Sequence, residues 1–86
     1  MMQVLIAKSA VKALRKMQPE KAKDIREAIS RMARDPAAPN NNVKALKGIK
    51  DGYRIRVGDW RVSYVSDRVS QTLKVFEIAP RGGAYR

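Results

Sequence analysis

Apolar positions in the first half of the chain follow the spacing of a short strand and two helices. The run from Gln3 to Ala7 (QVLIA) is typical of a strand, and Ser9 is a suitable N-cap for a helix that continues to about Met17. A second helix is expected from Pro19 to about Arg34, because proline favours the first helical position and Asp35-Pro36 would end the helix. Its buried side is expected to contain Ala22, Ile25, Ile29, Met32 and Ala33.

The second half of the chain has the patterning of β-strands. Strands are expected at Gly52 to Val57, Trp60 to Ser66 and Thr72 to Ala79, with Gly58-Asp59 as a two-residue turn between the first two. The predicted order is an N-terminal strand, a two-helix hairpin and a three-stranded antiparallel β-meander. These elements predict a single α+β domain over residues 1–86, with one four-stranded, mostly antiparallel sheet and both helices packed on one of its faces.

The predicted hairpin has one apolar and one basic face. A two-residue turn places Arg56 opposite Arg61, and like charges in that position repel each other. The arginines could extend into water, pair with Glu77 or Asp59, or bind an anion; three on one face with no acid between them favour binding. The core face is predicted to hold Tyr53, Ile55, Val57, Trp60, Val62 and Tyr64, and the opposite face Arg54, Arg56, Arg61 and Ser63.

The overall charge agrees with an anionic partner. Lys and Arg number 19 against 8 acidic residues, a net charge of +11, so the counterpart is a nucleic acid, an acidic protein or an anionic membrane surface, with nucleic acid favoured. More basic residues and one aromatic flank the hairpin, a combination suited to single-stranded RNA. They are Lys44, Lys47 and Lys50 before it, and Arg81, Tyr85 and Arg86 near the chain end.

Several classes of chemistry and location are excluded by composition. The chain has no cysteine and no histidine, which excludes disulfides, thiol chemistry and imidazole acids, bases or metal ligands. No metal site and no cofactor are expected. The apolar run near the N-terminus is too short for a signal peptide or a membrane span, so we expect a cytoplasmic protein that does not enter a membrane.

Two segments carry a family resemblance. The run from Lys44 to Val65 (KALKGIKDGYRIRVGDWRVSYV) and the end from Phe76 to Arg86 (FEIAPRGGAYR) resemble the second half of the RelE/ParE superfamily of bacterial type II toxin-antitoxin toxins. The order of strand, two helices and β-meander matches that superfamily across nearly the whole chain. The resemblance is closer to the RelE-like mRNA endonucleases, because ParE-like relatives generally lack the combination of Arg61, Arg81 and Tyr85.

The resemblance implies an activity and roles for these residues. RelE-like toxins enter the ribosomal A site and cut mRNA without a metal ion, by helping a ribose 2′-hydroxyl attack the adjacent phosphate, and so inhibit translation. Arg61 then matches the arginine that stabilises charge on the scissile phosphate, Arg81 the arginine near the leaving group, and Tyr85 the tyrosine that orients the nucleotide or takes the 2′ proton. The RNA-binding residues are Lys44, Lys47, Lys50, Arg54, Arg56 and Arg86.

Other points remain open at this stage. Arg54 and Arg56 stand where the family's type member has lysines, and arginine is a poor base, so the general base is not identified; Tyr85 could also be a frayed terminal residue. The resemblance implies a cognate antitoxin, small, acidic and partly helical, and a toxin-antitoxin hetero-oligomer that binds its own operator DNA. The alternatives are a ParE-like inhibitor of DNA gyrase and a basic binding module without catalytic activity.

Overall fold

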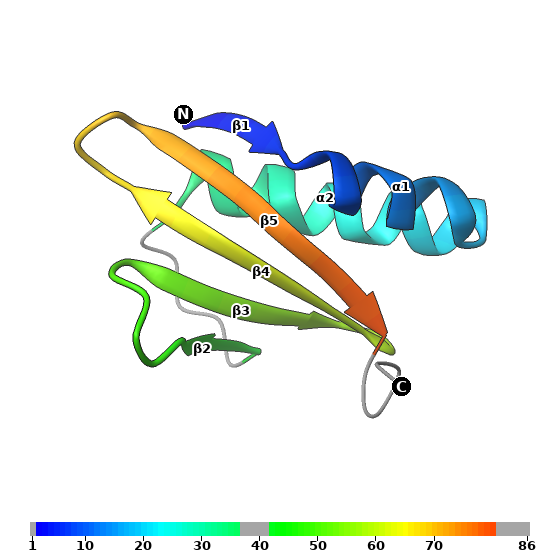
Figure 1. Cartoon of the computed structure of the whole chain (residues 1–86). Coiled ribbons are helices and arrows are strands. Elements are labelled where there is room, and N and C mark those ends of the chain that lie inside the picture. The colour runs from blue at the N-terminus through cyan, green and yellow to red at the C-terminus, as the bar shows by residue number, and fades with distance from the viewer. Residues whose placement is uncertain (1, 37–41, 81–86) are drawn as a thin grey trace.

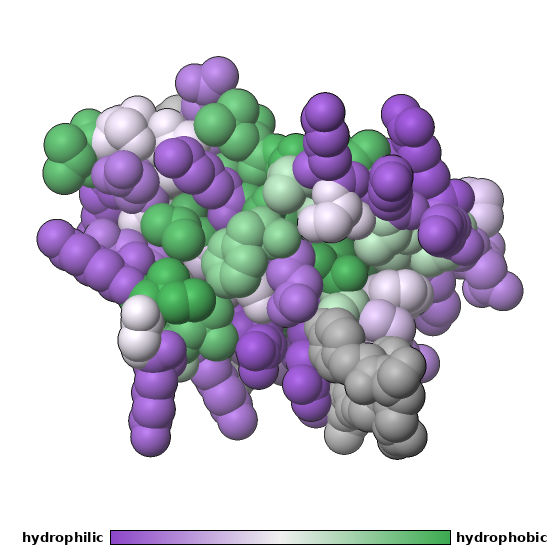
Figure 2. All heavy atoms as spheres, viewed as in Figure 1, coloured by the Kyte–Doolittle hydropathy of each residue, from purple (hydrophilic) through white to green (hydrophobic). Residues whose placement is uncertain are grey.

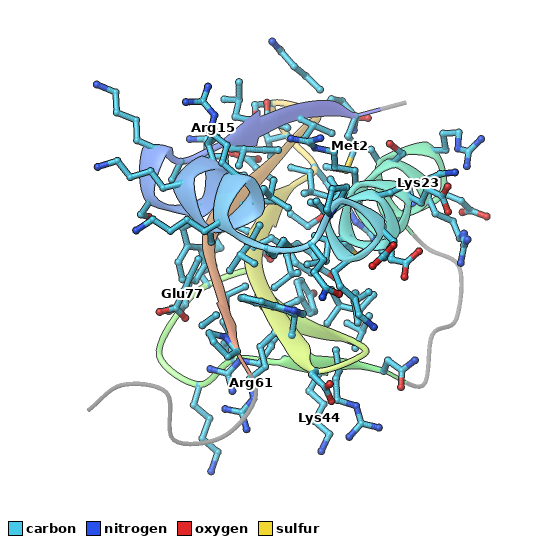
Figure 3. All side chains as sticks on the ribbon, turned by 90° about the vertical axis from the view of Figure 1, so that its right-hand side faces the viewer. Met2, Arg15, Lys23, Lys44, Arg61 and Glu77 are labelled. Carbon is cyan, nitrogen blue, oxygen red and sulfur yellow. The ribbon has the colours of Figure 1, made fainter. Side chains whose placement is uncertain are left out.

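The computed structural model describes residues 2–36 and 42–80. It has the α+β architecture predicted above, with a mixed sheet and two adjacent helices on one side of it (Figures 1 and 3). In the described part of the chain, neither helix is long and apolar enough to cross a lipid bilayer. The elements are β1 (Gln3–Ile6), α1 (Lys8–Lys16), α2 (Pro19–Arg34), β2 (Val43–Ala45), β3 (Gly52–Val57), β4 (Trp60–Asp67) and β5 (Thr72–Pro80).

The sheet has five strands in the order β1-β5-β4-β3-β2, one more than the sequence predicted. The additional strand is β2, which pairs antiparallel with β3 and places Lys44 opposite Arg54. It has only three residues, too few for the alternation of Val43, Lys44 and Ala45 to predict a strand, so its extended conformation depends on hydrogen bonding to β3. The pairing of β1 with β5 is parallel and the other three pairs are antiparallel, so the sheet is mostly antiparallel, as predicted.

Both helices bury the side that their apolar spacing indicated. Pro19 begins α2, as expected, but α1 begins at Lys8 with Ala7 as its N-cap and without a capping side chain, so the prediction for Ser9 was wrong. Met32 is only half-buried, because it lies at the margin of the core. The buried residues of the helices are Ala10 and Leu14 in α1 and Ala22, Ile25, Ile29 and Ala33 in α2.

The β3–β4 hairpin has the predicted register. Gly58 has a φ of 59°, which glycine adopts readily, and the two-residue turn places Arg56 opposite Arg61 and Ile55 opposite Val62. Ile55, Val62 and Tyr64 are buried beneath the helices, while Tyr53, Val57 and Trp60 pack against the edge of that core. The predicted apolar face of the hairpin is therefore confirmed.

A β-bulge interrupts the pairing of β4 with β5. Val62 is opposite Ile78 and Ser63 is opposite Glu77, but the next residue, Tyr64, is opposite Val75. Phe76 is therefore an extra residue in β5. Since Val75 and Ile78 are both in the core, the bulge places Phe76 and Glu77 consecutively on the face that the helices do not cover.

The contribution of α2 to stability can be measured at Ile25, which is fully buried. Ile25→Ala should lower the free energy of unfolding by about 2 to 5 kcal/mol, because it removes buried apolar surface and leaves a cavity. Urea denaturation followed by circular dichroism measures the change. Val69→Ala is the control, since Val69 is 98% exposed and should change stability by no more than about 0.5 kcal/mol. Equal effects of the two substitutions would contradict this packing.

Candidate nucleic-acid interface

Four basic side chains are grouped on strands β2, β3 and β4 on the outer face of the sheet, where neither described helix packs. We call Lys44, Arg54, Arg56 and Arg61 the basic face. The strand register brings them together, with Lys44 opposite Arg54 on β2 and β3, and Arg56 opposite Arg61 on β3 and β4. Figure 3 shows Lys44 and Arg61 at the end of the molecule away from the two helices. The arginine grouping predicted for the hairpin is thus present, and β2 adds Lys44 to it.

The charge of the basic face is not neutralised within the described residues. None of the four side chains forms an ion pair with another described residue. Neither Glu77 nor Asp59 pairs with the arginines; Glu77 lies opposite Ser63 on the neighbouring strand. Unit charges of like sign at short range repel one another, and an anion between them would relieve the repulsion. The arrangement is therefore suited to binding phosphate.

Sequence reasoning placed Ser63 and Arg54 on this face but missed that a polar atom of each is buried. Ser63 was predicted to share the exposed basic face, yet only 1% of its surface is accessible, because it lies in the middle of the sheet between Arg54 on β3 and Glu77 on β5. Its Oγ and the Nε of Arg54 are both buried and have no hydrogen-bond partner among the residues that the structure describes. A buried polar atom without a partner costs about 1 to 3 kcal/mol. Buried polar atoms without partners are often found at functional sites.

An apolar area lies beside the basic face. Leu5 on β1 and Phe76 on β5 are exposed, and Val65 on β4 is half-buried. Ile49 is also exposed and packs closely over Gly52. A Cβ atom added to Gly52 would lie only 2.7 Å from Cγ2 of Ile49, so a larger residue at position 52 would displace Ile49. Figure 2 shows apolar side chains in the middle of the visible face, between charged ones. The alternation of Leu73 and Val75 already places Phe76 outward, whereas the bulge is what adds Glu77 to the same face and returns Ile78 to the core.

The remaining predicted site residues divide into two groups. Lys47 and Lys50 are exposed in the connection between β2 and β3, where Gly48 and Asp51 have positive φ angles. Arg81, Tyr85 and Arg86 lie outside the described residues, and their roles stay predictions. The described chain ends at Pro80, which is opposite Trp60. Within residues 2–36 and 42–80, no three acidic, histidine or cysteine side chains are grouped as metal ligands.

The buried hydroxyl of Ser63 allows a direct test. Ser63→Ala should raise the free energy of unfolding by about 1 kcal/mol, because it removes a buried group without a partner and hardly changes the volume. Ser66→Ala is a matched control, because the Ser66 hydroxyl donates a hydrogen bond to Sδ of Met2 at 3.8 Å. This variant should be slightly less stable than the unaltered chain. Urea denaturation measures the free energy of unfolding of both variants. If Ser63→Ala lowers it by more than about 1 kcal/mol, the Ser63 hydroxyl stabilises the fold and the expectation is wrong.

Comparisons with known proteins agree with this architecture. The sequence model of the family described as "ParE toxin of type II toxin-antitoxin system, parDE" matches residues 4–85. A candidate toxin of Methanocaldococcus jannaschii, RelE1, is 32% identical over 84 residues, which are 96% of this chain and 93% of that protein. The RelE of the RelE–RelB complex from Pyrococcus horikoshii superposes with a TM-score of 0.83 at 30% identity, covering 96% of this chain and 98% of that one.

The isolated RelE toxin of E. coli has the same fold. Its crystal structure superposes with a TM-score of 0.80 over 99% of this chain and 89% of that chain, at 16% identity. The match of the family's sequence model over nearly all residues and the 32% identity to RelE1 go beyond a shared fold. The chain therefore belongs to the ParE toxin family of type II toxin-antitoxin systems, on the RelE-like branch of the RelE/ParE superfamily.

Proposed function

We propose that this toxin is an endoribonuclease that cuts mRNA on the ribosome, without a metal ion, and thereby inhibits translation. The observation that carries the proposal is the basic face: four cationic side chains on the side of the sheet where neither described helix packs, with no ion pair to any described acid. An extended phosphate backbone has the charge and the length to contact them together. A cytoplasmic location follows from this activity, since that is where ribosomes translate.

The proposed reaction needs fixed cations more than it needs a histidine. The ribose 2′-oxygen bonds to the adjacent phosphorus, the bond from phosphorus to the 5′-oxygen of the next nucleotide breaks, and the 2′ proton leaves to a base. Arg61 stabilises the negative charge that develops on the phosphate, and Arg81 that on the departing 5′-oxygen. Tyr85 orients the nucleotide or accepts the 2′ proton, which requires nearby cations to lower its pKa from about 10.

The remaining basic residues bind and position the RNA in this proposal. Arg54 and Arg56 lie within the same rows of the sheet as Lys44 and Arg61, so each would contact a phosphate near the one that is cut. Lys44, Lys47, Lys50 and Arg86 would extend the contact along the backbone. Arginine stays protonated at any physiological pH, so Arg54 and Arg56 act as charges and not as bases.

The partner of the toxin follows from its relatives. The Pyrococcus horikoshii relative is in a complex with RelB, and a RelB–RelE complex from Methanococcus jannaschii superposes with a TM-score of 0.71 at 25% identity. We expect a cognate antitoxin, small, acidic and partly helical, that inhibits this chain by covering the basic face. The toxin-antitoxin hetero-oligomer would also bind its own operator DNA.

A second candidate function is inhibition of DNA gyrase. One observation favours it: the family whose sequence model matches residues 4–85 is described by its ParE member. The mRNA endonuclease remains the better candidate, because Arg61 lies on the basic face together with Arg54 and Arg56, and the sequence also contains Arg81 and Tyr85.

Cleavage by purified ribosomes translating a defined mRNA tests the proposal. The unaltered chain should produce new mRNA ends within codons in the A site, mapped by primer extension. Arg61→Ala and Arg81→Ala should each lower the cleavage rate by about 10² to 10³, because each removes a contact to charge that develops in the transition state.

Arg15→Ala is the control for charge. Arg15 is exposed on α1, on the opposite side of the sheet, so its removal lowers the net charge equally and should leave cleavage unchanged. Full cleavage by both Arg61→Ala and Arg81→Ala would rule out the assignment of these residues. Intact mRNA together with cleaved DNA complexes of gyrase would establish the second candidate instead.

A further inference from the structure

The bulge in β5 places a carboxylate next to the basic face. Glu77 lies opposite Ser63 on β4, and Arg61 lies two residues before Ser63 on the same strand and the same face of the sheet. Residues in such a diagonal position across an antiparallel pair have their Cβ atoms about 7 to 8 Å apart. Figure 3 shows Glu77 and Arg61 on the part of the sheet that lies below α1 in that view. The acid is therefore a neighbour of the arginine assigned to the scissile phosphate.

The carboxylate of Glu77 has no role within the described part of the protein. Glu77 is half-buried, and it forms no ion pair or hydrogen bond with a described residue. The hydroxyl of Ser63, directly opposite, is also without a partner there, so it can donate a hydrogen bond that orients the carboxylate. The charged groups of the elements around Glu77 are cations, namely Arg61 on β4, Lys74 on β5, and Lys8, Lys12, Arg15 and Lys16 on α1.

Glu77 is better placed than the other acids of the hairpin and its loops. Asp67 ends β4, which puts it about 20 Å from Arg61 at the rise of roughly 3.3 Å per strand residue. Its carboxylate also accepts hydrogen bonds from two backbone N–H groups of the turn that follows. Asp51 lies at that same end of the hairpin, where its carbonyl accepts a hydrogen bond from β4. Asp59 is exposed in the turn and does not belong to a paired position of the sheet.

The proposed reaction requires a base for the 2′ proton, and arginine cannot supply one. A carboxylate can act as the general base when it lies within hydrogen-bond reach of the hydroxyl that it deprotonates. We propose that Glu77 is this base, and that its carboxylate takes the 2′ proton while Arg61 holds the phosphate that the 2′-oxygen attacks. This proposal rests on the proposed function, and it leaves Tyr85 the role of orienting the nucleotide.

The space between Glu77 and Arg61 suits this step. A direct ion pair would occupy the carboxylate, whereas a ribose and its 3′ phosphate can lie between the two side chains and contact both. The 2′ O–H bond then breaks and its proton goes to Glu77, the 2′-oxygen bonds to phosphorus, and the bond from phosphorus to the 5′-oxygen breaks. The 5′-oxygen takes a proton from water, and Glu77 later returns its proton to water. The products are a 2′,3′-cyclic phosphate and a 5′-hydroxyl.

Single-turnover cleavage of a short mRNA in the A site of purified ribosomes tests the proposal. Glu77→Gln keeps the size of the side chain but cannot accept the proton, so the rate constant should fall by about 10²- to 10⁴-fold. Binding of the variant to the ribosome should be as tight as before or tighter, because a negative charge has been removed from an RNA-binding surface. Glu77→Asp should recover part of the rate. Faster cleavage by Glu77→Gln would show that Glu77 acts only through its charge.

Asp59→Asn is the control for charge, since it removes an equal charge near Arg61 at an acid without a role in the proposed reaction. Its rate constant should equal that of the unaltered chain. The pH profile gives a second readout, because a protonated carboxyl cannot accept the 2′ proton. Cleavage by the unaltered chain and by Asp59→Asn should therefore slow on acidification, and this decrease should be absent from Glu77→Gln.

An mRNA with sulfur in place of the bridging 5′-oxygen at the cut separates a base from a group that assists the leaving oxygen. A thiolate leaves without stabilisation by a cation, so Arg81→Ala should regain most of its rate on this substrate. Glu77→Gln should not, because the 2′ proton must still be removed. Recovery of Glu77→Gln on the sulfur substrate would contradict its assignment as the base.

The outcomes separate this proposal from the proposed function. Normal cleavage by Glu77→Gln together with an inactive Arg61→Ala would overturn the assignment of Glu77 and leave the endoribonuclease in place. A pH profile that changes in Tyr85→Phe but not in Glu77→Gln would assign the base to Tyr85 instead. Absence of cleavage by the unaltered chain would overturn the proposed function itself.

Discussion

The two-residue turn at Gly58 and Asp59 sets the register of β3 against β4, and both surfaces of the sheet depend on that register. Side chains alternate along a strand, so a slip by one residue would exchange the core residues for the arginines. In the observed register Ile55 and Val62 are buried, and each contributes about 1.5 to 3 kcal/mol. The repulsion between Arg56 and Arg61 costs less than about 1 kcal/mol, so hydrophobic burial outweighs it and stabilises the register that the turn sets.

The same register gathers basic side chains on the outer face of the sheet. Lys44, Arg54 and Arg61 lie there, whereas acidic residues at α2 and at the end of the hairpin away from its turn line a groove between α2 and β3 on the inner side. This negative charge is local, because the exposed surface of α1 and α2 also carries nine Lys and Arg side chains. What distinguishes the outer face is therefore the close grouping of its cations across paired strands.

The tertiary pairing determines details that local patterns do not contain. β2 has only three residues, too few for a strand signal of its own, and forms because β3 offers a free edge with matching hydrogen bonds. The bulge in β5 arises where Ser63 and Tyr64 meet Glu77 and Val75, and it places Glu77 beside Phe76 on the outer face. Ser63 is polar and was predicted to be exposed with the arginines, but its central position buries it.

The sequence by itself determined the helices, the hairpin register, the basic face and the family. Helical spacing with Pro19, a two-residue turn with a glycine, and strict alternation from Tyr53 to Tyr64 are local signals that need no knowledge of distant contacts. Only the tertiary structure decided the fifth strand, the bulge, the burial of Ser63 beside Arg54, and the groove between α2 and β3. Each of these depends on how segments far apart in the chain pair or leave one another uncovered, and periodicity within a single segment carries no information about that.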